Sequence, residues 1–177
     1  MTKPLSLADH AVLALLAERP RHGWAIVGEL APEGELGRVW TLSRPLAYRA
    51  MDMLESRRLV RATGTEPGQG PRRRIFAPTA TGRREIEAWL GSPVRHLRDV
   101  RTELLLKLVF YERSGRDPRP LLSDQQRALR PIFAALDTAV SRPSADLVDL
   151  WRFESAESVR RFLAEASRTR YRRPRGD

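Results

Sequence analysis

The side chains that could do chemistry in this sequence are mainly arginines, joined by one tyrosine. Arg44 and Tyr48 have the i, i+4 spacing that places two residues on the same face of a helix. Further along, Arg72, Arg73 and Arg74 are adjacent and follow a segment rich in glycine and proline. Guanidinium groups pair with phosphate oxygens or guanine edges, and a tyrosine hydroxyl donates to phosphate. These residues therefore suggest recognition of a nucleic acid.

Patterns for catalysis and metal binding are missing from the sequence. The chain has no cysteine, which excludes disulfides, thiol chemistry and cysteine-ligated zinc. His10, His22 and His96 lie far apart without the spacing of metal ligands, and we interpret His22 as a capping or packing residue. No Gly-x-Ser-x-Gly turn or phosphate-binding glycine loop with a lysine occurs. We therefore expect a protein that is not an enzyme and has no cofactor or metal.

Composition limits the size of the fold and indicates a class of partner. With 177 residues and 41% apolar content, the chain can bury one core, or one core and a second small one. The net charge is +10, carried almost wholly by arginine, so the surface attracts polyanions before any specific contact forms. Free use of arginine in a GC-rich genome is the alternative explanation of this charge. The charge supports a nucleic-acid partner without establishing it.

The sequence shows no sign of entering a membrane. Neither an apolar signal core near Met1 nor an unbroken run of about 18 to 20 apolar residues occurs. We therefore expect a cytoplasmic protein that associates with the nucleoid when it is bound to DNA.

The first half of the chain predicts three helices followed by a β-hairpin. Ser6 and Asp9 form a capping box that begins a helix over 6–18. A short helix follows Gly23, and a third, capped by Thr41 or Ser43, runs to about Arg57.

The third helix has the pattern of a groove-reading helix. Its inward face is expected to consist of apolar residues spaced at i, i+4, i+7 and i+8: Leu46, Ala50, Met53 and Leu54. Arg44, Tyr48, Met51 and Glu55 are expected on the opposite face, flanked by Ala47 and Arg49. We predict DNA contacts by Ser43, Arg44, Ala47, Tyr48 and Arg49. The alternative is a solvated face with a half-packed tyrosine.

The hairpin that follows is expected to form a basic wing. Residues 59–63 and 74–77 alternate like strands, and 67–71 form the turn between them. Arg72, Arg73 and Arg74 are placed at the tip, with no nearby acid after Glu66, so that they would contact phosphate or the minor groove. A charged turn without a partner is the alternative. A fourth helix, capped by Thr81 and containing Trp89, completes a domain over 1–92.

The second half changes to proline-punctuated helices. A helix over 104–111 is apolar on nearly every side, and two amphipathic helices over 122–140 and 148–166 follow. A short link at 141–144 predicts an antiparallel helical hairpin able to pair with a second copy, with Pro131 kinking or splitting its first helix. We therefore expect a helical dimerisation domain over 93–167.

The end of the sequence is strongly basic. Residues 168–177 contain five arginines together with Tyr171, and we expect them to be disordered.

Several segments together carry a resemblance to a known family. They are the apolar first helix, Pro20 to Ile26 with its His-Gly-Trp turn, 43–54 with Tyr48, and Phe76 leading to Thr79, Thr81-Gly82 and Trp89. Over about Leu5 to Leu90 the chain resembles the PadR family of bacterial transcriptional regulators, where the turn typically reads His-Gly-Tyr. The resemblance implies a winged helix-turn-helix, and the second half looks like the dimerisation region of larger members.

The chain departs from the family pattern at the end of the third helix. Arg57-Arg58-Leu59 stands where the family commonly has a glycine before the leucine. The usual left-handed helix end is therefore either absent or built by a strained arginine.

The resemblance also implies a small hydrophobic effector, because some members of the family bind one. Aromatic residues of the chain could line such a site at a dimer interface, or could simply pack in the core. Our candidates for the effector site or dimer interface are Trp89, Phe110, Trp151 and Phe162.

The expected fold class is mainly α with a small β-hairpin wing, in a winged helix-turn-helix domain followed by a helical dimerisation domain. The expected function is sequence-specific binding of double-stranded DNA by a homodimeric repressor on an inverted repeat, with a small aromatic or hydrophobic effector releasing it. The alternative is a non-catalytic winged-helix interaction module that binds polyanions without sequence choice.

Overall fold

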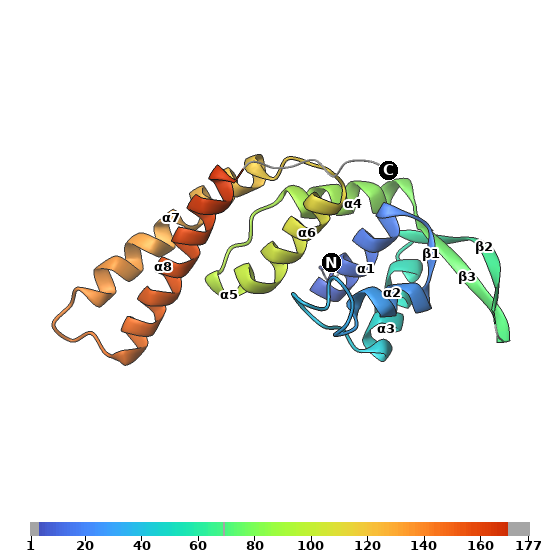
Figure 1. Cartoon of the computed structure of the whole chain (residues 1–177), viewed down its shortest axis with the longest axis horizontal. Helices are drawn as coiled ribbons and strands as arrows, with labels where there is room; N and C mark the ends of the chain where they lie inside the picture. Colours follow the sequence, from blue (N-terminus) through green and yellow to red (C-terminus); the bar gives the residue numbers. More distant parts are fainter. Residues whose placement is uncertain (1–3, 69, 170–177) are drawn as a thin grey trace. The chain divides into compact units, whose positions relative to one another are not determined.

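The computed structural model describes residues 4–68 and 70–169. The chain divides into two compact units, Met1–Gly91 and Ser92–Asp177 (Figure 1), so the boundary lies one residue before the expected position. The expectation of a mainly helical chain with a small β wing is confirmed. The tail expected to be disordered lies outside the described residues from Arg170 onward.

The N-terminal unit is built around helix α1 (Leu7–Glu18). The predicted capping box is confirmed, because the Ser6 hydroxyl accepts a hydrogen bond from the Asp9 amide at 3.2 Å and the Asp9 carboxylate accepts one from the Ser6 amide at 2.8 Å. Residues 11–16 are all buried. α1 packs against α3 (Arg44–Ser56), α4 (Ala80–Gly91) and the sheet, so it forms the centre of this unit.

A three-stranded antiparallel sheet completes the N-terminal unit. Its order is β1 (Arg21–His22), β3 (Gly70–Pro78), β2 (Val60–Gly68), and β1 leads directly into helix α2 (Gly23–Leu30). β2 and β3 are longer than expected, so residues 72–74 lie within a strand and not at the tip, which corrects their predicted position. The pairing of the two strands continues past Gly64, with Thr65 opposite Arg74 and Glu66 opposite Arg73.

The end of α3 decides between the two alternatives left open by the sequence. Arg58 adopts a φ of 56°, so the left-handed helix end is present and is built by an arginine. The Arg58 amide donates to the Glu55 carbonyl at 2.8 Å, and the Leu59 amide donates to the Leu54 carbonyl at 2.9 Å. The Thr79 hydroxyl holds the same point by donating to the Arg58 carbonyl at 2.8 Å.

Thr79 also corrects the predicted start of α4. Its hydroxyl accepts a hydrogen bond from the Gly82 amide at 3.1 Å, so Thr79 caps the helix and Thr81 does not. Thr79 lies between the end of β3 and the start of α4, where its amide also donates to the Leu59 carbonyl at 2.8 Å.

The C-terminal unit is helical throughout its regular structure. A continuous stretch comprises α5 (Leu97–Asp99), a π-helical segment η1 (Val100–Leu104) and α6 (Leu105–Arg113). Two long helices, α7 (Arg119–Val140) and α8 (Leu147–Arg168), pack side by side as the predicted hairpin (Figure 1).

Pro131 does not split α7, which is continuous from Arg119 to Val140. The proline is exposed, so the carbonyl that loses its helical partner faces the solvent side, where water can satisfy it. Of the two predicted effects of Pro131, a kink or a split, the split is therefore wrong.

Two buried polar side chains fix the segment that enters this unit. Gln125 makes a reciprocal pair with the Val94 backbone, accepting from its amide at 2.8 Å and donating to its carbonyl at 2.9 Å. Lys107 is fully buried and donates to the Ser92 carbonyl at 2.8 Å, with Glu103 as its ion-pair partner. Burial lowers the pKa of Lys107, against the opposing effect of Glu103.

None of the helices in the described residues is long and apolar enough to cross a membrane.

We expect Arg58→Gly to stabilise the protein by about 1 kcal/mol, because glycine removes the left-handed strain at a modest entropic cost. Thermal unfolding measures the effect. Arg57→Gly is the matched control, since Arg57 has a φ of −86° and glycine there should only destabilise. An equal loss of stability in both variants would show that Arg58 is not strained.

Candidate nucleic-acid interface

The exposed face of α3 differs from the predicted one by a rotation of the helix. The buried residues are Ala47, Ala50, Met51 and Leu54, whereas Leu46 is 49% exposed and Met53 is 37% exposed. The predictions that Leu46 and Met53 face inward and that Met51 faces outward were therefore wrong. Apolar residues occur on two overlapping stripes of this helix, and the stripe with two alanines is the one that packs against α1.

Ala47 has no exposed surface, so it cannot contact a partner, and its prediction as a DNA-binding residue was wrong. The other four residues predicted on this helix are exposed: Ser43, Arg44, Tyr48 and Arg49. Ser43 takes the N-cap position, but its side chain makes no capping hydrogen bond. The first turn of α3 also contains no acidic residue, so its amides and hydroxyl suit an anion.

The wing arginines differ in their surroundings. Arg74 forms an ion pair with Glu55 at the end of α3, in which Nη1 lies 3.2 Å from Oε2, and its guanidinium lies 4.7 Å from the ring centre of Phe76. Arg73 stands opposite Glu66 in the strand register. The expectation that these arginines have no nearby acid is therefore wrong for Arg74, because the long hairpin brings β3 back along α3.

A hollow of about 510 Å³ joins Arg44 and Tyr48 to the wing arginines, whereas Ser43 and Arg49 are not part of its lining. It lies among the start of α2, the exposed face of α3, and β3. Its lining contains four arginines and one carboxylate: His22, Gly23, Trp24, Arg44, Tyr48, Met51, Asp52, Arg72, Arg73, Arg74 and Phe76. The hollow is therefore a concave and positively charged surface, suited to a polyanion.

The sequence pattern missed Trp24 as a surface residue. It counted as one of the apolar positions of a short helix, yet its side chain is 53% exposed and lies beside Arg44. His22 agrees with its interpretation as a cap, because its Nδ1 accepts a hydrogen bond from the Ala25 amide at 3.1 Å.

The aromatic residues predicted for an effector site or dimer interface fall into two groups. Trp89 is buried in the N-terminal unit and stacks on His10, with ring centres 5.0 Å apart, and Phe110 is buried in the C-terminal unit. Both are core residues, so their assignment to such a surface was wrong. Trp151 and Phe162 keep exposed surface on α8.

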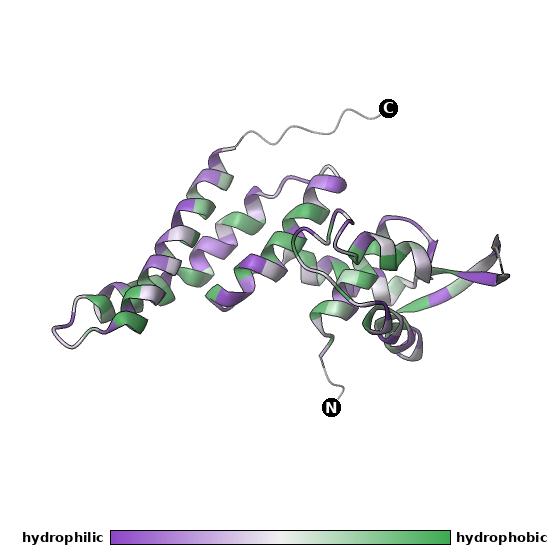
Figure 2. Cartoon of the chain, turned by 60° about the horizontal axis from the view of Figure 1, so that its bottom comes forward, coloured by the Kyte–Doolittle hydropathy of each residue, from purple (hydrophilic) through white to green (hydrophobic). Residues whose placement is uncertain are grey.

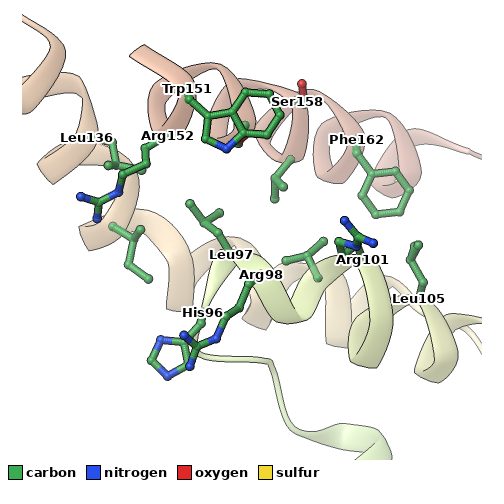
Figure 3. A pocket seen from close by; sticks show the side chains of 14 residues that line it. His96, Leu97, Arg98, Arg101, Leu105, Leu136, Trp151, Arg152, Ser158 and Phe162 are labelled. Carbon is green, nitrogen blue, oxygen red and sulfur yellow. The ribbon is translucent and has the colours of Figure 1, made fainter. Parts of the chain in front are cut away.

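Trp151 and Phe162 line a cavity of about 840 Å³ in the C-terminal unit (Figure 3). The two rings on α8 face the segment of α5 and η1 that carries Leu97 and Arg101. The wall is mostly apolar with three arginines, Arg98, Arg101 and Arg152, among its residues. Such a wall suits a hydrophobic molecule or side chain.

Across residues 4–68 and 70–169, histidine and acidic side chains form no group that could hold a metal ion.

Comparison with known proteins identifies the N-terminal unit. Residues 12–88 match the model of the transcriptional regulator PadR-like family. The N-terminal unit is therefore similar to the PadR-like family over these residues, which make up less than half of the chain. The match begins within α1 and ends within α4, and it includes the hollow between α3 and the wing. The description of this family names transcriptional regulators, and it is the family that the sequence resembles over about Leu5 to Leu90.

The relatives of this chain are distant. The probable transcriptional regulator Rv1176c of Mycobacterium tuberculosis is 27% identical over 96 residues, which is 54% of this chain and half of that protein's length. Bacillus subtilis PadR in complex with operator DNA is 20% identical, covering 93% of this chain and 99% of that one, with a TM-score of 0.49. The same protein in complex with p-coumaric acid is 18% identical, covering 90% and 96%, with a TM-score of 0.45.

We expect Glu55→Gln to strengthen binding to any DNA duplex while changing the free energy of unfolding by less than about 1 kcal/mol, because the ion pair is exposed. The substitution removes a negative charge beside the hollow and releases Arg74 to a phosphate. Fluorescence anisotropy at several salt concentrations should show the slope of log K against log salt steepening by about 0.9.

The control for Glu55→Gln is Glu154→Gln, an equal charge change at an exposed position of the C-terminal unit. Equal gains in the two variants would mean that net charge alone is responsible and that Arg74 gains no contact.

Proposed function

We propose that this chain is a sequence-specific DNA-binding transcriptional regulator that acts in the cytoplasm as a homodimeric repressor. The observation that carries the proposal is the single basic hollow that joins the exposed face of α3 to the wing, within a PadR-like domain. α3 of each subunit enters a major groove of an inverted repeat, and the half-site centres lie about 10 base pairs, or a small multiple, apart.

The exposed residues of α3 and the wing divide into two roles. Arg44 reads base edges from the first turn of α3, while Ser43, Tyr48 and Arg49 contact the backbone. Arg72 and Arg73 hold phosphates from the wing and carry little sequence information.

A second copy of the chain covers the start of α8. Four large apolar residues are exposed there: Leu147, Val148, Leu150 and Trp151, of which Leu147 is 82% exposed and Trp151 is 71% exposed. Figure 2 shows hydrophobic residues continuing to the loop end of the α7–α8 hairpin. A contiguous apolar patch of this kind marks an interface in a small soluble unit. The dimer fixes the separation of the two DNA-reading helices.

A small aromatic or hydrophobic effector binds the cavity beside this patch. The three arginines in its wall favour an acidic group on such a molecule. Binding there shifts the dimer and releases the DNA, because both reading helices must be in register at once.

We expect Arg44→Ala to lower the preference for the chosen sequence over random duplex by about tenfold. The double variant Arg72→Ala, Arg73→Ala should instead weaken binding to all duplexes equally. The slope of log K against log salt should become shallower by nearly the amount expected for the loss of two phosphate contacts. Both are measured by anisotropy on duplexes selected from a random pool, over about 50 to 300 mM salt.

Arg161→Ala, which removes an exposed arginine from α8, controls for net charge. Equal binding of the wild type to all duplexes, collapsing with salt, would replace this proposal with a module that binds polyanions through the charge of +10 alone.

We expect Trp151→Asp to raise the dimer dissociation constant by at least about 100-fold, because a charge would be buried at the centre of the interface. Sedimentation equilibrium measures it. Leu46→Asp, likewise a change from an exposed apolar residue to an acid but in the N-terminal unit, should leave the dimer intact. A Trp151→Asp protein that remains dimeric would place the interface elsewhere.

A further inference from the structure

The first turn of α2 lies against side chains from the first half of α3. Two residues of β1 hold it in the sheet, where His22 pairs with Ile75 of β3. The His22 side chain then caps α2 through the Ala25 amide. The positions of Gly23 and Trp24 relative to α3 are therefore fixed from both sides.

Gly23 allows the ring of Tyr48 to lie directly against the backbone of α2. A Cβ atom at position 23 would lie 2.8 Å from Cε1 of Tyr48 and 3.0 Å from Sδ of Met51. Any larger residue would displace one of these side chains. Glycine thus sets the place of the Tyr48 ring.

Trp24 and Tyr48 together hold the guanidinium of Arg44. Its central carbon lies 5.2 Å from the ring centre of Trp24 and 5.7 Å from that of Tyr48. Both distances fall within the range of about 6 Å for cation–π attraction. The arginine at the start of α3 is therefore ordered by two aromatic rings from different helices.

This form of restraint leaves Arg44 able to read a base. Among the described residues no carboxylate forms an ion pair with Arg44, whereas Arg74 in the same hollow is paired with Glu55. A ring holds a guanidinium through its face, so the N–H donors along its edge remain available. That edge matches the O6 and N7 acceptors of guanine.

We propose that Trp24 is a positioning residue for sequence recognition, which with Tyr48 holds Arg44 in the pose that pairs with a guanine in the major groove. The inference rests on the proposed function and deepens it. An arginine without this support would lose its rotamer freedom on binding and would bind phosphate as readily as a base.

The test uses the full chain and the duplex that the wild type selects from a random pool. Each guanine of that duplex is replaced in turn by 7-deazaguanine, which lacks the N7 acceptor but pairs normally. We expect one guanine per half-site at which the replacement weakens wild-type binding by about tenfold. Arg44→Ala should be insensitive to that replacement.

A double-mutant cycle then links Trp24 to Arg44. Trp24→Ala should weaken binding to the selected duplex by about fivefold and reduce the sensitivity to 7-deazaguanine, without changing affinity for random duplex. Adding Trp24→Ala to Arg44→Ala should cost nothing more, because the tryptophan acts through the arginine. Additive losses would overturn the inference.

Conservative variants separate positioning from folding. Trp24→Phe should restore the sensitivity to 7-deazaguanine, while Trp24→Leu, apolar but without a π face, should not. Met53→Ala, which shortens another half-exposed side chain outside the hollow, is the control for loss of apolar surface. Thermal unfolding of each variant identifies any that fails to fold. If Trp24→Ala does not fold, the comparison is made between Trp24→Phe and Trp24→Leu.

The outcomes distinguish this inference from the proposed function. Equal binding of the wild type to all duplexes would remove both. A wild type that selects a sequence, with full 7-deazaguanine sensitivity kept by Trp24→Ala or Trp24→Leu, would leave the regulator in place and exclude a role for Trp24. If Arg44→Ala weakens binding to selected and random duplexes equally, Arg44 contacts a phosphate and not a base, and the inference is wrong.

Discussion

The close packing of α3 on α1 is the constraint on which the candidate interface depends. α3 presents Arg44 and Tyr48 outward only because Ala47 and Ala50 are small enough to let its other side lie against α1. Seven of the twelve residues of α1 are buried, and the helix packs against α3, α4 and β3. A larger side chain at either alanine would tilt the reading face and the wing together, since β2 continues directly from the end of α3.

The two units are stabilised by polar side chains in different positions. The N-terminal unit combines an apolar core with polar side chains that cap and join its elements, such as Thr79 and His22. The C-terminal unit keeps two polar side chains, Lys107 and Gln125, wholly inside, and both bond the backbone of the segment that leads into it. A buried polar group must keep its hydrogen-bond partners, so the backbone at Ser92 and Val94 is held in one conformation. The opposing cost is the desolvation of Lys107 and Gln125.

Elements with strong local signals could be predicted from the sequence, and contacts between elements could not. The capping box at Ser6, the short α2 and the α7–α8 hairpin follow from spacing and capping alone. The rotation of α3 was missed because Leu46 and Met53 are as apolar as the residues that face α1, and only packing decides between the stripes. Of the candidate site, Arg44, Tyr48 and the wing arginines were predicted, while Trp24 and the Glu55 partner of Arg74 depend on how β1 and the long hairpin fold back.

The ion pair between Glu55 and Arg74 would have a kinetic consequence for the proposed search for one sequence among many. The carboxylate occupies the guanidinium as a phosphate would, so contact of this wing residue with DNA requires exchanging one anion for another. The exchange weakens binding to every duplex by the same free energy, and this matters most where the other contacts are few. A chain with so large a positive charge would otherwise remain trapped wherever it first landed, and this internal competitor shortens each stay.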